Sequence, residues 1–156
     1  MFHQISLIIP ALVLLPNLVF FSVKPVNVFV PFLKEPIILV VLKRIGQITA
    51  FIGPLFFAVS FNGWPEKIAA GFMAVMLLLY YFCWIRFFSR KREYRWLFEP
   101  LFFIPVPMAV FPIAYFLLGA GIMHSLPLLA AGVVFAAGHI PVSLLQHQYV
   151  GKNLPR

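Results

Sequence analysis

The sequence contains almost no acidic residues and little charge of any sign. Aspartate is absent, Asp and Glu together number 4 among 156 residues, and all charged residues together make up 10%. An ordinary soluble domain carries roughly 25% charged residues. A disordered segment has low hydrophobicity, whereas 63% of this chain is hydrophobic. The composition therefore excludes a soluble globular domain and a disordered chain, and it predicts a membrane protein.

Cysteine is nearly absent as well. Cys83 is the only one in the chain, so an intramolecular disulfide is excluded. The sequence also lacks the Cys/His spacing of a metal site, a glycine-rich phosphate-binding loop and a nucleophile elbow. We therefore expect no metal and no cofactor, and no motif identifies a catalytic residue.

Apolar residues are abundant and lie in five long runs. These runs cover residues 5–23, 45–61, 68–88, 97–118 and 126–145. About 20 residues of α-helix cross a hydrocarbon core about 30 Å thick, so each run is long enough for one crossing. Continuous runs favour helices over the alternating strands of a membrane barrel. We expect an all-α polytopic integral membrane bundle of five transmembrane helices, forming a single domain over 1–156 with a short basic tail at 146–156.

The start of the second helix is ambiguous. Residues 36–42 are also apolar, and only Lys43 and Arg44 separate them from the run at 45–61. One interpretation makes residues 35–44 an interfacial lead-in whose basic side chains extend to the lipid headgroups. The alternative is a single longer, tilted helix. The first helix lacks the basic segment of a secretory signal, so we expect it to be retained.

Basic residues alternate between the connections. Eleven of the 12 lie in the first connection, the third connection and the C-terminal tail, and Lys67 alone lies in the second. With an odd number of helices these three segments share one side of the membrane. Because basic segments stay in the cytoplasm, we predict an outside N-terminus and a cytoplasmic C-terminus. The expected location is the plasma membrane, which in a prokaryote is the bacterial or archaeal inner membrane.

The formal net charge of +8 lies mostly on this cytoplasmic side. Residues 86–95 mix basic and aromatic side chains, a combination also found in nucleic-acid-binding proteins. Between two membrane helices it favours anionic lipids instead, and we expect no nucleic-acid partner. The predicted anionic-lipid contacts are Arg86, Arg90, Lys91, Arg92, Arg95, Lys43 and Arg44.

In this orientation, all five helices contribute polar side chains to the cytoplasmic half. Polar groups in hydrocarbon prefer the bundle interior, because burying an unpaired one costs several kcal/mol. The pattern predicts a polar cavity that opens to the cytoplasmic side. Snorkelling side chains and hydrogen bonds between helices are the alternative explanation. The candidate ligand-binding residues are His139, Ser143, Gln47, Thr49, Tyr80, Tyr81, Asn17 and Glu99.

The fifth helix is the best candidate to line this cavity. The residues expected on its inward face, at helical spacing, are Gly132, Ala136, His139, Ser143 and either Gln146 or His147. Pro141 removes a backbone donor beside His139, which predicts a bend. His139 has three interpretations, in order of preference: a packing residue, a proton acceptor or a metal ligand.

Glu99 and the prolines after it are expected at the start of the fourth helix. There the Glu99 carboxylate lies beside the positive helix N-terminus, and Arg95 is its expected ion-pair partner. Prolines at 100, 105, 107 and 112 each remove a backbone donor, so residues 104–112 are expected to be irregular. This segment is either a kinked structural helix or the lining of a site.

Small residues recur every four positions in the second helix, at Gly46, Ala50 and Pro54. Such a stripe lets helix backbones approach closely. It predicts tight packing, either within one chain or between copies.

Three functions are compatible with these features. The preferred hypothesis is a small membrane protein that binds or translocates an anionic or lipid-like ligand from the cytoplasmic leaflet, as an oligomer or accessory subunit. The first alternative is a lipid-modifying enzyme with His139 as base, Glu99 as acid or orienting group, and Tyr80 or Tyr81 as donor. The second is a purely structural subunit. The expected partners are membrane lipids, especially anionic ones, and further copies or a larger membrane complex.

Overall fold

The computed structural model describes residues 3–27 and 34–153, and these fold into helices without any β-strand. The α-helices are α1 (Ile8–Ser22), α2 (Ile37–Ile52), α3 (Trp64–Ser89), α4 (Pro107–Ile122) and α5 (Leu126–Asn153). The 3₁₀ helices are η1 (Gln4–Leu7), η2 (Gly53–Phe56) and η3 (Tyr94–Leu97). The predicted all-α class is confirmed.

Four helical segments of the described chain are long and apolar enough to cross a membrane. They are Gln4–Ser22, Ile37–Phe56, Trp64–Ser89 and Leu126–Asn153. The fifth apolar helix, α4, is shorter. Together they form a helical membrane bundle, in which large apolar side chains such as Ile5, Leu78 and Ile85 face outward.

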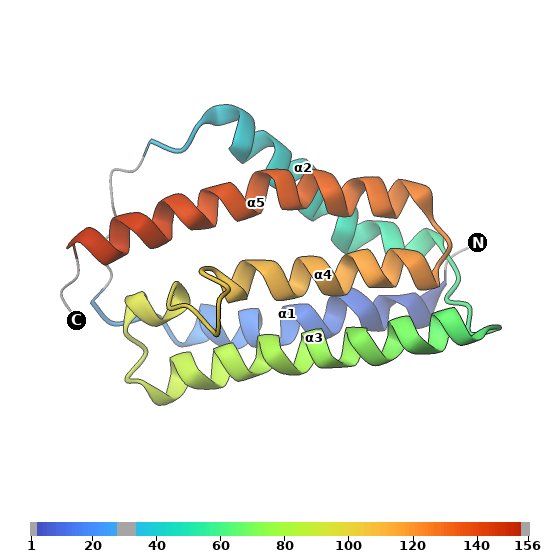
Figure 1. Ribbon diagram of the computed structural model, residues 1–156, viewed down its shortest axis with the longest axis horizontal. Helices are drawn as coiled ribbons and strands as arrows, with labels where there is room; N and C mark the ends of the chain where they lie inside the picture. Colours follow the sequence, from blue (N-terminus) through green and yellow to red (C-terminus); the bar gives the residue numbers. More distant parts are fainter. Residues whose placement is uncertain (1–2, 28–33, 154–156) are drawn as a thin grey trace.

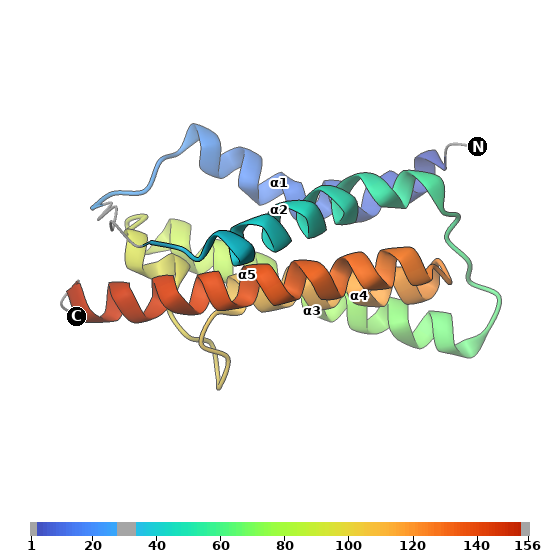
Figure 2. The same ribbon diagram turned by 90° about the horizontal axis from the view of Figure 1, so that it is seen from above.

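The helices run alternately up and down, so the two termini lie at opposite ends of the bundle (Figure 1). α3, α4 and α5 form one layer, with α4 in the middle, and α1 and α2 form a second layer against it (Figure 2). α2 packs mainly on α5, whereas α1 lies on α3 and α4. The middle helix α4 is therefore the most buried element.

α1 and α2 converge at one end and diverge at the other (Figures 1 and 2). They meet at the end that holds the N-terminus, where His3 N donates to Leu55 O at 2.8 Å and Ser6 Oγ donates to Phe57 O at 2.6 Å. Toward the opposite end the two helices separate. We call this the basic end, because Lys24 and the residues 90–92 lie there.

The first and third connections meet at the basic end, as predicted. Val26 N donates to Arg92 O at 2.8 Å, and Tyr94 N donates to Val26 O at 3.1 Å. The C-terminal half of α5 is tied to the same end, since Gln146 Nε2 donates to Glu35 Oε1 at 2.8 Å. The basic segments therefore lie side by side, whichever face of the membrane they occupy.

α2 starts at Ile37, ahead of the predicted run at 45–61. This extent agrees with the longer-helix alternative, because residues 37–44 belong to the same helix as the run after them. Lys43 and Arg44 continue the helix because their long side chains extend away from its axis. Lys43 is also neutralised by Glu35, whose Oε2 lies 3.5 Å from Lys43 Nζ.

Proline decides where two helices end and begin. The α-helix ends at Ile52, and η2, which contains Pro54, follows it and ends at Phe56, short of the predicted 61. The predicted helix at 97–118 is wrong at its start, because α4 begins only at Pro107, which occupies the first turn. Proline lacks the amide donor that an interior turn needs, but the first turn does not use that donor.

α5 continues through the expected tail. It was predicted at 126–145 with a tail at 146–156, but it remains helical to Asn153. Pro141 lies inside it and does not end it. The last basic residue, Arg156, lies outside the described residues. The expected bounds of the first and third helices, 5–23 and 68–88, agree with η1 plus α1 and with α3 to within a few residues.

Glycine lets α2 and α5 pack at backbone distance. A Cβ on Gly46 would overlap the backbone of Phe135, and one on Gly138 would overlap the backbone of Lys43. Ala50 and Pro54 are also buried. The small-residue stripe of the second helix therefore packs within the chain, and Gly138 is its counterpart on α5.

Candidate functional site

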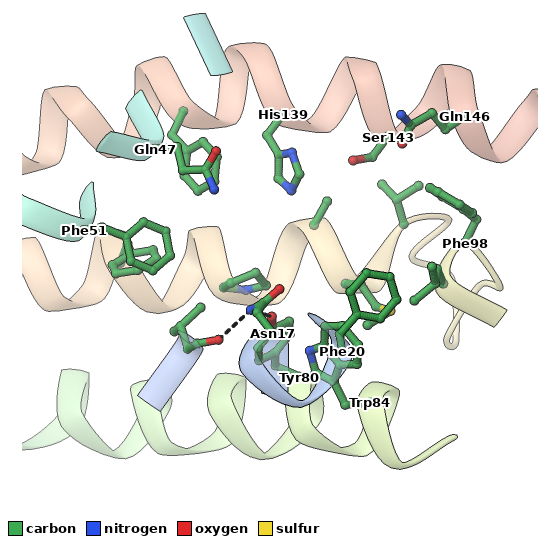
Figure 3. A pocket seen from close by; sticks show the side chains of 18 residues that line it. Asn17, Phe20, Gln47, Phe51, Tyr80, Trp84, Phe98, His139, Ser143 and Gln146 are labelled. Atoms are coloured by element: carbon green, nitrogen blue, oxygen red, sulfur yellow. Dashed lines mark hydrogen bonds between the residues drawn. The ribbon is translucent and has the colours of Figure 1, made fainter. Parts of the chain in front are cut away.

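All five helices contribute to one partly open cavity of 260 Å³. It lies between the α1 and α2 layer and the α3, α4 and α5 layer, where polar side chains from both sides point toward one another (Figure 3). Five of the eight predicted ligand-binding residues line it: Asn17, Gln47, Tyr80, His139 and Ser143. The fold thus brings these five residues to one cavity, and their role in ligand binding stays a prediction.

α5 supplies one polar wall of the cavity. His139, Ser143 and Gln146 follow one another at helical spacing and all line it. Phe135, one turn before His139, stacks on the imidazole with ring centroids 5.0 Å apart and an interplanar angle of 13°. This stacking holds the imidazole with its edge toward the cavity (Figure 3).

α1 and α3 supply the opposite wall. Asn17 Nδ2 donates to Val13 O at 2.8 Å and to Tyr80 OH at 2.9 Å, so the amide joins the two helices. The Asn17 side chain carries two donor hydrogens on nitrogen, and both are used. Its carbonyl oxygen keeps its acceptor capacity and makes no hydrogen bond with the described residues.

Two buried nitrogen atoms of the lining have no hydrogen-bond partner within the described part of the chain. They are Trp84 Nε1 and His139 Nδ1. The Trp84 indole contacts the Tyr80 ring edge-on, with centroids 6.1 Å apart, but its N–H does not meet an acceptor in hydrogen-bond geometry. Each unpartnered buried polar group costs about 1–3 kcal/mol. Both nitrogens have almost no accessible surface, so they lie behind the cavity wall.

No Asp, Glu, Lys or Arg lines the cavity among the described residues. A compensated pair of charges adjoins the lining residue Gln146, because Glu35 accepts from Gln146 and pairs with Lys43. Outside the membrane-spanning helices, burial first and then the Glu35 carboxylate raise the pKa of the Tyr94 phenol. The cavity surface is therefore mainly apolar, and its polar groups are formally uncharged apart from the titratable imidazole of His139.

Three predicted ligand-binding residues lie elsewhere. Thr49 Oγ1 donates to Ile45 O of its own helix at 2.9 Å, and the residue borders an apolar groove outside the cavity. Tyr81 OH donates to Leu12 O at 2.6 Å. Leu12 is four residues before Pro16, whose missing amide leaves this carbonyl free, so Tyr81 replaces a lost helix bond.

Glu99, the third of these residues, lines a second cavity of 490 Å³ at the basic end, together with His147. It lies in the loop before α4, and its carboxylate makes no hydrogen bond or ion pair with any described residue. The expected partner Arg95 is instead 2.7 Å from Glu93, measured from Nε to Oε2. Phe98 lines both cavities, and His147 Nδ1 donates to Phe98 O at 2.7 Å.

Three of the predicted anionic-lipid contacts surround one indole ring. The guanidinium carbons of Arg86, Arg90 and Arg95 lie 5.6, 5.1 and 5.5 Å from the centroid of Trp96. Arg86 also donates to Glu99 O at 2.5 Å and to Pro100 O at 2.9 Å, so it braces the loop.

The other four predicted lipid contacts lie on two elements. Lys91 and Arg92 form the turn after α3, in left-handed backbone conformations with φ of 54° and 57°. Lys43 and Arg44 lie in the middle of α2. Arg86 and Lys43 are thus engaged within the chain, whereas Arg90, Lys91 and Arg44 are exposed.

The sequence-based search missed Trp84 and Phe98. Trp84 lies four residues after Tyr80, so helical spacing already places it on the same face and could have identified it. Phe98 gave no such signal, because its position depends on a loop. In residues 3–27 and 34–153 no group of three or more His, Cys, Asp or Glu side chains is placed to hold a metal ion.

Comparisons with protein-family models, with curated proteins and with solved structures found no match. The functional conclusion therefore rests on the geometry of the cavity and its surroundings.

Proposed function

We propose that this protein binds a lipid-like ligand in the cavity shared by its five helices. One observation carries the proposal: side chains with hydrogen-bonding groups from four helices line one cavity among aromatic residues, namely Asn17, Gln47, Tyr80, His139 and Ser143. Buried polar groups are almost always satisfied in native proteins, by protein atoms, water or a ligand. A ligand with hydrogen-bonding oxygen atoms would pair with those of these groups that face the space.

The arrangement of α1 and α2 supports entry from the membrane. The two helices diverge toward the basic end, and Gln47 on α2 is both exposed and part of the lining. By the positive-inside rule this end belongs to the cytoplasmic leaflet, so a lipid-like ligand would enter from there. Aromatic walls, among them Phe20, Phe51 and Phe116, suit an apolar chain or ring.

The size of the cavity limits what the ligand can place inside it. Pockets that enclose a drug-sized molecule have volumes of roughly 300–1,000 Å³. A space of 260 Å³ takes a head group or part of a chain, and the rest of the ligand stays in the bilayer. Translocation would therefore require assembly with further copies or a partner protein, and we keep both as proposed partners.

The basic end supports a second class of contact, with the anionic lipids of the surrounding leaflet. Arg90 and Lys91 are exposed at this end, and Arg44 is exposed in the middle of α2. Such residues attract anionic headgroups by about 1 kcal/mol each near the surface. We propose that they fix the protein in the plasma membrane with its C-terminus in the cytoplasm. The lipid-modifying alternative has less support, because His139 and Glu99 line different cavities.

Photolabelling in vesicles tests the proposal. The protein is reconstituted with a mixture of diazirine-bearing oleoyl lipids, and labelled peptides are mapped. We expect cavity residues such as Asn17 and Gln47 to be labelled, and we expect an excess of unlabelled oleoyl lipid to prevent this labelling. The lipid-facing residues Leu78 and Ile85 serve as the control. Labelling there should decrease only in proportion to the dilution of the probe by unlabelled lipid.

Filling the cavity sharpens the test. Ala109 lines it and is buried, so Ala109→Phe occupies the space and should abolish the competed label. Ser143→Leu is a second, milder block in case Ala109→Phe does not fold. Leu78→Phe on the lipid-facing surface is the matched control. Labelling confined to the outer surface, and equal in all these variants, would contradict the proposal.

A further inference from the structure

The chemistry of the cavity lining narrows the class of ligand, and this inference rests on the proposed function. The polar groups that face the space are the amides of Asn17, Gln47 and Gln146 and the hydroxyl groups of Tyr80 and Ser143. The rings of Trp84 and His139 also line the space, but their unpartnered nitrogens, Nε1 and Nδ1, are buried behind its surface. None of the described lining residues carries a guanidinium, ammonium or carboxylate group.

The positive charges that could neutralise an anionic head are engaged elsewhere. Lys43, the cation nearest the rim, pairs with Glu35, and Glu35 also accepts from Gln146. Arg86 binds backbone carbonyls of the loop, and Arg95 is paired with Glu93. These arginines surround Trp96, which lines the other cavity and not this one.

An ionised phosphate or carboxylate would therefore lose its water in this cavity without meeting a counterion. Burying an unpaired charge in a low-dielectric space is far more costly than burying a hydrogen-bonded neutral group. The Ser143 hydroxyl group can donate to an acceptor such as a carbonyl, ester or hydroxyl oxygen. The Gln47 amide can both donate and accept, and Asn17 keeps its acceptor oxygen, which suits a neutral head that also donates and accepts.

We infer that the ligand is an amphiphile with an uncharged, oxygen-bearing head, such as an acylglycerol or a long-chain alcohol or quinone, and not an ionised phospholipid. The head occupies the cavity between Trp84 and His139, and the tail leaves between α1 and α2. The basic end then attracts anionic lipids of the surrounding leaflet, while the cavity excludes them. The protein surface thus selects anionic headgroups, and the cavity selects uncharged ones.

Fluorescence of a single tryptophan tests this inference directly. The chain has 3 Trp residues, and replacing Trp64 and Trp96 by Phe leaves Trp84 as the only reporter, inside the cavity. If Trp96→Phe prevents folding, Trp96→Tyr keeps a larger ring. The probes are matched brominated lipids with the same acyl chain: a monoacylglycerol, a lysophosphatidylglycerol and a free fatty acid. Each is titrated into nanodiscs that hold the protein.

We expect saturable quenching of Trp84 by the monoacylglycerol, with half-saturation at a mole fraction at least tenfold lower than for either anionic probe. Ala109→Phe should remove this quenching. In the control protein Trp64 and Trp84 are replaced instead, so that Trp96 is the only tryptophan and reports the basic end. There the lysophosphatidylglycerol should quench the Trp96 fluorescence more strongly than the monoacylglycerol.

Other outcomes separate the two proposals. Saturable quenching of Trp84 by an anionic probe, as strong as or stronger than by the neutral one, overturns the inference and leaves the proposed function standing. Absence of saturable quenching of Trp84 by every probe overturns both. Equal quenching of Trp84 by the neutral lipid with and without Ala109→Phe also counts against the inference and the proposed function. The lipid would then contact Trp84 from outside the cavity.

Discussion

Gly138 on α5 lies directly against the backbone of Lys43 on α2, so that no side chain fits between the two helices at this point. One turn of helix away along the same contact, Gly46 on α2 lies against the backbone of Phe135. The backbone of each helix therefore packs directly against a glycine of the other helix. This contact sets the position of α2, and with it the divergence of α1 and α2 toward the basic end (Figure 2).

Substituting Gly138 tests the importance of this contact. Gly138→Ala should lower the free energy of unfolding by about 1–3 kcal/mol, because backbone atoms cannot yield to the added methyl group. The matched control is Gly71→Ala in α3, where nothing lies within 4 Å of the new Cβ. Alanine there should be neutral or stabilise the helix by up to about 1 kcal/mol. Unfolding in detergent micelles, followed by circular dichroism during an SDS titration, measures both. Equal stability of the two variants would show that α2 adjusts freely.

The hydrogen bond from Tyr81 to Leu12 O should stabilise the protein without affecting ligand binding. Tyr81→Phe should cost about 1 kcal/mol, since it leaves the carbonyl freed by Pro16 without a donor. Pro16→Ala restores the helix amide, so Tyr81→Phe should cost much less in that background. The double-mutant cycle is measured by the same SDS titration. An undiminished cost in the Pro16→Ala background would disprove the link to the proline.

Glu35 and Glu99 should respond differently to removal of their charge. Glu35→Ala breaks the contacts with Gln146 and Lys43 and should lower the stability by about 1 kcal/mol, a value limited by its partial exposure. Glu99→Gln should change the stability little, because its carboxylate has no partner among the described residues. Thermal unfolding at low and high salt compares the two, and the effect of Glu35→Ala should shrink in high salt. A larger effect at Glu99 would mean that its cavity holds a bound cationic group.

The orientation predicted from basic residues can be measured with cysteine labelling. Cys83 is fully buried and is the only native cysteine, so Cys83→Ala gives a background without thiols. In this background Asn62→Cys reports the connection between α2 and α3, and Lys91→Cys reports the basic end. A membrane-impermeant maleimide should label the first in intact cells and the second only after permeabilisation. The reverse pattern would invert the topology, and with it the leaflet from which the ligand enters.

Much of the fold followed from local features of the sequence. Long apolar runs are selected by the bilayer itself, so the five helices could be located without knowledge of their packing. The bounds were least accurate where proline or charge interrupted a run. A proline can occupy the first turn of a helix, so any of the prolines before α4 could have started it. That α4 begins at Pro107 depends on the preceding loop, which Arg86 binds at Glu99 O and Pro100 O.

The candidate site was predictable in part for the same reason. Helical periodicity placed His139 and Ser143 on one face, and depth in the membrane brought Asn17, Gln47 and Tyr80 to the same level. Periodicity could not distinguish Tyr80, which faces the cavity, from its neighbour Tyr81, which binds Leu12 O.

Sequence alone determined that this chain is a bundle of apolar helices whose basic connections lie at one end, because hydrophobic length and charge act on each segment separately. Tertiary structure decided which polar groups pair with each other and which are left facing a common space. Asn17 and Tyr80 satisfy one another across α1 and α3, whereas Trp84 and His139 remain unsatisfied. That difference depends on hydrogen-bond geometry between helices far apart in sequence, which no local pattern specifies.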